Sequence, residues 1–83
     1  MATMQIRIFT PAETKTIREI LKGFGFFYEG GSIQNYPDGK KHVFIGCATG
    51  GAISLGDHLG DKVHEELGAD EVYVNGLRLY PNF

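Results

Sequence analysis

The chain has 83 residues, of which 42% are hydrophobic and 22% charged, and its formal net charge is −2. This length fits a single domain over residues 1–83. The composition excludes a disordered or collagen-like chain, and no apolar run approaches the roughly 20 residues that a bilayer requires. One cysteine cannot form an internal disulfide, and the N-terminus has no signal-peptide pattern, so a reducing, cytoplasmic setting is expected.

Charge is distributed unevenly along the chain. Residues 1–45 carry six basic and four acidic side chains, whereas residues 46–83 carry two basic and six acidic ones, which gives charges of +2 and −4. A typical nucleic-acid-binding domain has a strongly basic surface. The opposed charges of this chain suit recognition of a patterned protein surface at least as well.

The first predicted elements are a strand and a helix. Residues 4–8 alternate apolar and polar side chains, which predicts a half-buried strand. Thr10-Pro11-Ala12-Glu13 has the pattern of a capping box, with proline at the first helical position. The helix should end near Gly23 or Gly25, either of which can adopt a left-handed conformation. Its apolar stripe consists of Ile17, Ile20, Leu21 and Phe24.

A β-hairpin is predicted next. Residues 26–28 and 32–36 favour extended structure, with a break at Glu29-Gly30-Gly31. Pro37-Asp38-Gly39 favours a turn, because proline presets φ, aspartate can bond its own backbone and glycine accepts a positive φ. Residues 41–46 form the returning strand.

A second helix is expected over residues 55–67, where leucine or valine recurs at every fourth position. Gly60 lies inside this helix and costs roughly 1 kcal/mol relative to alanine. Gly68 is the expected residue at the C-terminal cap.

The last segment predicts a second hairpin. Val72 and Val74 share one parity and Leu77 and Leu79 the other, so a single straight strand would place the two pairs on opposite faces. A two-residue turn at Asn75-Gly76 would pair Val74 with Leu77 and Val72 with Leu79, all on one side. A bulge at Gly76 is the alternative interpretation.

The predicted order β-α-β-β-α-β-β indicates an α+β fold. We expect a small antiparallel or mixed sheet of four or five strands with two helices on one face, since this arrangement covers both apolar helix stripes. It is either the ferredoxin-like, split βαβ arrangement or a related two-layer sandwich.

A glycine-rich loop is predicted between the returning strand and the second helix. The free amides of a helix N-terminus attract anions, so a ligand role is possible. The spacing, however, is not G-x-G-x-x-G and no P-loop lysine follows, which favours a flexible crossover. The candidate ligand-binding residues are Gly46, Thr49, Gly50, Gly51 and Ser54.

Two further patterns contain residues that could form a chemical site. Cys47 would need a low thiol pKa to act as a nucleophile, and no motif places a histidine beside it, so a buried, inert cysteine is expected. Asp57, Asp61 and His64 fall within about 60° of one another on a helix and could meet one metal ion. A solvated acidic face is the simpler interpretation, and no metal, cofactor or catalytic residue is predicted.

Nucleic-acid binding is the main alternative function. Basic side chains on the outer side of the first helix could contact phosphates, with two more lysines at the hairpin turn. The acidic second helix argues against a continuous basic groove. The candidate contacts are Lys15, Arg18, Lys22, Lys40 and Lys41.

One family resemblance bears on this alternative. Residues 17–68 run helix, GFGF, GGS, PDGKK, strand, Gly-Gly loop, helix. This order resembles HicA-type toxins, which are small RNA-cleaving proteins with a dsRNA-binding-domain-like fold. That family carries a catalytic histidine directly after its Gly-Ser. Here Ile33 follows Gly31-Ser32, so the catalytic residue does not carry over, and the first strand and last hairpin depart from the pattern.

The ten aromatic residues exceed what so small a core can hold. Tyrosine and phenylalanine at a surface commonly anchor protein contacts. We therefore predict a non-enzymatic interaction or regulatory protein, such as a phage or mobile-element inhibitor, that binds another protein or pairs with itself as a homodimer, with no membrane contact. The candidate partner contacts are Phe27, Tyr36, Tyr73, Tyr80 and Phe83.

Overall fold

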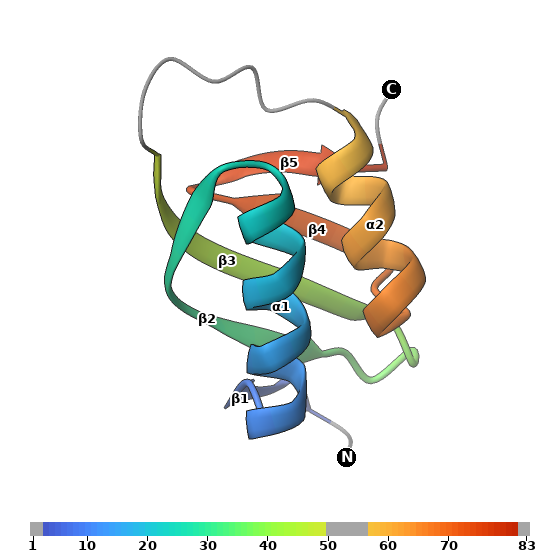
Figure 1. Cartoon of the computed structure of the whole chain (residues 1–83). Coiled ribbons are helices and arrows are strands. Elements are labelled where there is room, and N and C mark those ends of the chain that lie inside the picture. The colour runs from blue at the N-terminus through green and yellow to red at the C-terminus, as the bar shows by residue number, and fades with distance from the viewer. Residues whose placement is uncertain (1–2, 50–56, 82–83) are drawn as a thin grey trace.

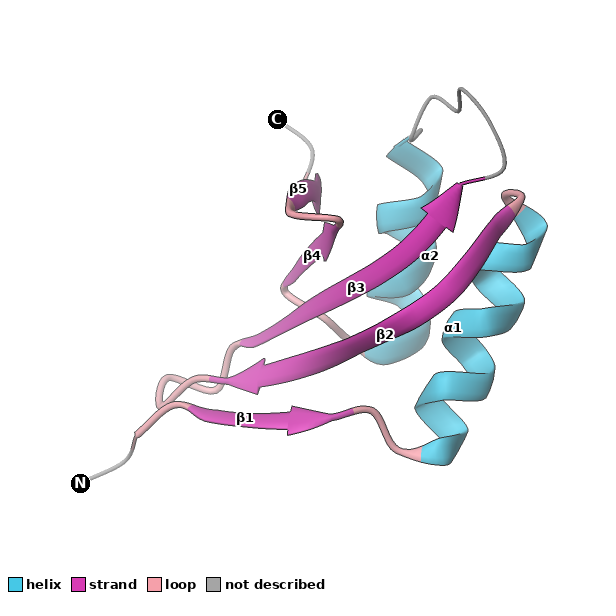
Figure 2. Cartoon of the chain, turned by 90° about the vertical axis from the view of Figure 1, so that its left-hand side faces the viewer, coloured by secondary structure: helices cyan, strands magenta, loops and turns pink. Residues whose placement is uncertain are grey.

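The computed structural model describes residues 3–49 and 57–81, which form two helices and one five-stranded sheet. Both helices lie on the same side of the sheet (Figures 1 and 2). The predicted α+β architecture of two layers is therefore confirmed. In chain order the elements are β1 (Gln5–Ile8), α1 (Pro11–Gly23), β2 (Phe26–Asn35), β3 (Lys41–Thr49), α2 (Asp57–Leu67), β4 (Glu71–Val74) and β5 (Leu77–Tyr80).

The strands lie side by side in chain order, β1-β2-β3-β4-β5. Neighbouring strands are antiparallel except β3 and β4, which are parallel and are joined by α2. The strands joined by α1 are adjacent and antiparallel, whereas a split βαβ unit joins parallel strands. The fold is therefore the related two-layer sandwich and not the ferredoxin-like arrangement.

The first helix begins and ends as its sequence predicts. Thr10 Oγ1 accepts a hydrogen bond from the Glu13 amide at 3.2 Å, and Glu13 Oε1 accepts one from the Thr10 amide at 2.9 Å. Gly25, with a φ of 83°, follows the end of the helix. Ile17 and Leu21 are fully buried against the sheet. The predicted capping box and apolar stripe are both confirmed.

The second helix is described from Asp57, so its predicted start at residue 55 lies outside the described residues. A Cβ atom at Gly60 would clash with the backbone carbonyl of Leu79 in β5. Glycine at this position lets α2 lie directly on β5, which explains a residue that weakens the helix itself. Gly68 has a φ of 66° and its amide donates to the His64 carbonyl at 2.9 Å, as expected of a C-terminal cap.

The hairpin of β4 and β5 is confirmed, with a two-residue turn whose φ angles are 51° and 83°. Val74 lies opposite Leu77 as predicted. The second predicted pair is wrong, because the register shifts and places Val72 opposite Tyr80 and not Leu79. The strand irregularity therefore lies near Leu79, where β5 meets α2, and not at the turn.

The first strand departs from its prediction. Its alternation is present, but all four residues are exposed, including Ile6 at 61% and Ile8 at 80%. Arg7 lies opposite the buried Ile33 and therefore faces the helices, where it pairs with Glu13. The isoleucines point to the other side of the sheet, which no described element covers. The predicted half-burial of this strand is therefore wrong.

The hydrophobic core lies between the helices and the sheet. It contains the apolar stripes of both helices and the strand residues that face them. Its largest fully buried side chains are Ile17, Leu21, Ile33, Val43, Leu59, Val63, Val72 and Val74.

Candidate functional site

The side of the sheet that faces away from both helices is called here the helix-free face. The strand register brings residues of four strands into two rows across it, because residues directly opposite one another share a face. The first row is Ile6, Gln34, His42 and Glu71, and the second is Ile8, Ser32, Phe44 and Tyr73.

The centre of the helix-free face is a connected group of rings and polar atoms. Phe44 and Tyr73 stack with centroids 4.8 Å apart, and the rings of Tyr36 and His42 are 4.4 Å apart. His42 Nε2 lies 3.2 Å from Glu71 Oε2, and the Tyr73 hydroxyl donates to Glu71 Oε1. This hydrogen bond raises the pKa of Tyr73 above its ordinary value. These side chains therefore bond and stack mainly with one another.

The border of the helix-free face is apolar and exposed. Ile6 and Ile8 stand on β1, the outermost strand, beside the smaller or polar side chains of Gln34 and Ser32. Within the described residues no strand pairs with the outer edge of β1. Exposed apolar side chains on a strand with free backbone groups are a surface to which another chain can add.

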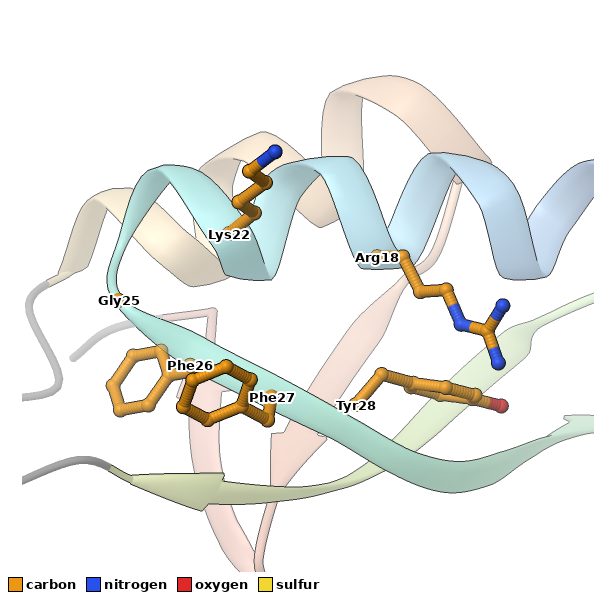
Figure 3. Close-up of a pocket in the computed structure, with 6 residues that line it drawn as sticks. All are labelled: Arg18, Lys22, Gly25, Phe26, Phe27 and Tyr28. Carbon is orange, nitrogen blue, oxygen red and sulfur yellow. The ribbon is translucent and has the colours of Figure 1, made fainter.

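A hollow of about 440 Å³ lies between α1 and the start of β2 (Figure 3). The Arg18 guanidinium lies 5.6 Å from the centroid of the Tyr28 ring, within the range of a cation–π contact. Phe27 is 68% exposed beside it. The lining residues are Arg18, Lys22, Gly25, Phe26, Phe27 and Tyr28.

The predicted partner contacts fall in different places. Tyr36 and Tyr73 lie half-buried on the helix-free face, and Phe27 is exposed at the start of β2. Tyr80 lies on the helix side, where its ring stacks on His64 with centroids 4.0 Å apart, so the structure does not bring it to the same surface. Phe83 lies outside the described residues.

The five basic residues predicted to contact phosphate do not form one surface. Lys15, Arg18 and Lys22 are exposed on α1, but the turn that carries Lys40 lies apart from α1 (Figure 2). Lys41 has a structural role: its Nζ donates to the Leu67 carbonyl at 3.2 Å, at the C-terminal end of α2. Only the three residues of α1 remain as a group.

The predicted glycine-rich loop begins later than expected. Gly46 pairs with Gly30 inside β3, and the strand continues to Thr49. Cys47 is 4% exposed, and burial raises the pKa of its thiol, which disfavours the nucleophilic thiolate. The expected buried cysteine is confirmed. The other candidate ligand residues, Gly50, Gly51 and Ser54, lie outside the described residues, and so does the side chain of Thr49.

Of the helix residues considered as metal ligands, Asp61 and His64 are described, and the side chain of Asp57 lies outside the described residues. His64 Nδ1 lies 2.6 Å from the Ala69 carbonyl oxygen, and its ring packs on Tyr80. Among residues 3–49 and 57–81, no three side chains of ligand type form a group that could hold a metal ion. Neither described helix is long and apolar enough to cross a membrane.

The position that carries the catalytic histidine in HicA-type toxins belongs to the core here. Ile33 is fully buried opposite Val43 and Arg7, so no catalytic side chain could reach solvent from it. No family model, curated protein or solved structure matches the chain.

The sequence prediction missed Ile6 and Ile8, which the structure places at the most exposed apolar border. One feature of the sequence could have indicated which side of the sheet these isoleucines face. Glu13 was predicted in the capping box, and an arginine six residues earlier is its natural partner. Had Arg7 been assigned to the helix side on that ground, the isoleucines would have been assigned to the opposite side.

Proposed function

We propose that this chain is a non-enzymatic protein-binding module that takes an extended segment of another protein onto the outer edge of β1. The observation that carries the proposal is the exposure of Ile6 and Ile8, 61% and 80%, on the outermost strand of the sheet. Strand addition uses the free backbone groups of an edge for affinity and alternate side chains for specificity.

The strand geometry defines the chemistry of the partner. Every second side chain of an added strand would lie on the helix-free face beside Ile6 and Ile8, and should be apolar. The intervening side chains would lie beside Arg7, which is already held by Glu13 at 2.7 Å, and should be polar. Each isoleucine that becomes fully buried contributes about 1.5–3 kcal/mol, and each new backbone hydrogen bond about 0.5–1.5 kcal/mol.

The remaining chemistry of the molecule supports a binding role over a catalytic one. The Cys47 thiol is buried, and the imidazole of His42 is engaged with Glu71 on an open sheet face. A module of this kind acts as an inhibitor or regulator by occupying an edge or segment that its partner needs elsewhere.

The test is a selection from a library of displayed ten-residue peptides, followed by NMR titration with the selected peptides. Selected peptides should carry apolar residues at alternate positions, and the amide signals of residues 5–8 should shift and exchange more slowly. Ile8→Asp should abolish binding. The matched control is Leu77→Asp, since Leu77 is also apolar and 54% exposed but lies on the opposite edge.

Two results would overturn the proposal. One is selection of peptides that shift other residues and are unaffected by Ile8→Asp. The other is formation of a dimer by the chain alone at micromolar concentration, abolished by Ile8→Asp, since a second copy would then be the occupant of the β1 edge.

A further inference from the structure

Two cationic side chains of α1 line the hollow together with an exposed ring. Arg18 and Lys22 stand one helical turn apart, with Phe27 and Tyr28 below them at the start of β2 (Figure 3). No carboxylate of the described residues forms an ion pair with either cation. The hollow itself is lined by no acidic residue. Its chemistry therefore favours a ligand with negative charge and a flat apolar group.

The ring of Phe27 is accessible because β1 is short. It pairs only with residues 32–35 of β2, so residues 26–31 of β2 are themselves an edge. Tyr28 lies opposite the buried Cys47 and faces the helix side, where Arg18 covers its ring. Phe27 also lines the hollow and leaves 68% of its surface in solvent. The ring of Phe27 is therefore accessible to a planar group.

The positive charge continues along α1. A second hollow lies beside the first and is lined in part by Lys15 and Arg18, so Arg18 stands between the two. Lys15 and Lys22 are seven residues apart, or about 10 Å along the helix axis. Glu19 lines the second hollow, which makes the first the stronger site for an anion. This line of cations fits a ligand with successive phosphates better than one with a single phosphate.

We propose that the first hollow binds a nucleotide unit, with its phosphate on Arg18 and Lys22 and its base stacked on Phe27. The guanidinium and ammonium groups match phosphate oxygens, and an aromatic ring stacks on any base. The unit is either a free nucleotide or part of a single strand whose next phosphate reaches Lys15. No residue of β1 lines the first hollow, so the inference for that hollow stands independently of the proposed function, whereas Ile8 lines the second hollow beside Lys15.

The test is fluorescence anisotropy with a labelled ten-nucleotide oligothymidylate, with AMP, O-phosphotyrosine and inorganic phosphate as competitors. For two or three phosphates, the logarithm of the affinity should fall with log salt at a slope of about −1.4 to −2. Phe27→Ala should weaken binding about 5- to 150-fold, whereas Phe27→Tyr should keep it. Lys22→Gln should reduce the slope by about 0.7. The control is Lys40→Gln, which removes an exposed lysine outside the hollow.

The competitors identify the source of the ligand. Displacement by AMP at the same concentration as the oligonucleotide points to a free nucleotide, and much tighter oligonucleotide binding points to a strand. Three results would overturn the inference: no binding at low salt, equal effects of Lys40→Gln and Lys22→Gln, or competition by phosphate or phosphotyrosine as strong as that by AMP. Circular dichroism of Phe27→Ala checks that this exposed substitution leaves the fold intact.

Discussion

The two outer strands of the sheet, β1 and β5, differ in how well their unpaired backbone groups are protected from another chain. A strand at an edge has unpaired backbone groups, to which another chain can add unless the edge is covered or distorted. β5 is both covered and distorted: its register against β4 shifts near Leu79, and α2 packs directly on it at Gly60. β1 pairs with β2 in regular register over all four residues and keeps its isoleucines exposed. Of these two outer strands, β1 is the one whose regular edge and exposed isoleucines suit the addition of a partner strand.

The anchoring of the two edge strands differs as well. β5 is held by buried packing, since Leu79 is 6% exposed and Tyr80 stacks on His64. β1 is held to the helix layer by a polar contact, the paired hydrogen bonds from Arg7 to Glu13 at 2.7 and 3.0 Å. The attachment of β5 is buried packing, whereas the attachment of β1 depends on charge. The β1 edge, which is open to binding, is therefore attached to the helix layer through a titratable group.

The largest change in stability is expected from a substitution at Gly60, where α2 contacts β5. Gly60→Ala places a methyl group against the Leu79 carbonyl, and overpacking of this kind costs about 1–3 kcal/mol, more than the helix gains from alanine. Urea unfolding measures the change. The matched control is Gly23→Ala, because Gly23 has open space around it, and this change should be neutral or stabilise by up to about 1 kcal/mol. Equal effects of the two substitutions would mean that α2 does not cover β5.

A smaller effect is expected from the polar attachment of β1. The hydrogen bonds from Arg7, with smaller contributions from Thr10, lower the pKa of Glu13 from 4.5 to about 2. A carboxyl with a lowered folded-state pKa stabilises the protein above its unfolded pKa, and this stability is lost as pH falls. Glu13→Gln should cost about 1–2 kcal/mol at neutral pH, limited by the exposure of Arg7 to solvent.

The pH dependence separates this attachment from ordinary surface charge. Between pH 4.5 and about 2, the unfolding free energy of the parent chain should fall towards that of Glu13→Gln, which should depend less on pH in this window. Glu65→Gln is the control, since Glu65 is exposed and forms no ion pair within the described residues. A parent chain and Glu13→Gln with parallel pH profiles would contradict the role given to the Arg7–Glu13 pair.

The contrast between the edges also explains what the sequence could predict. The capping box at Thr10 and Glu13 was readable because its partners lie three residues apart. The burial of β1 was not readable, because alternation shows that a strand has two faces but not whether anything covers them. The sheet order was equally hidden, since it depends on which strands pair across long separations.

The candidate site also contains features that local sequence patterns predict and features that depend on strand register. The excess of aromatic residues correctly indicated rings outside the core, and Phe27, Tyr36 and Tyr73 lie there. Tyr80 was misplaced with them, because parity assigns a face only while the register holds, and the register shifts between Val72 and Tyr73. A single irregularity thus moved one ring to the helix side, and no local pattern in the sequence marks that position.

The smallest effect on the free energy of unfolding is expected from Ile8, the residue most important to the proposed binding. Ile8 is 80% exposed, so Ile8→Asp removes almost no buried apolar surface from the free chain. Its free energy of unfolding should stay within about 0.5 kcal/mol of the parent value, as for Leu77→Asp on the other edge. Denaturation at two protein concentrations provides the measurement. A loss above about 1 kcal/mol that grows with concentration would mean that another copy already covers β1. Unchanged stability together with lost peptide binding would instead assign Ile8 to recognition alone, which is the property that distinguishes the open edge from the closed one.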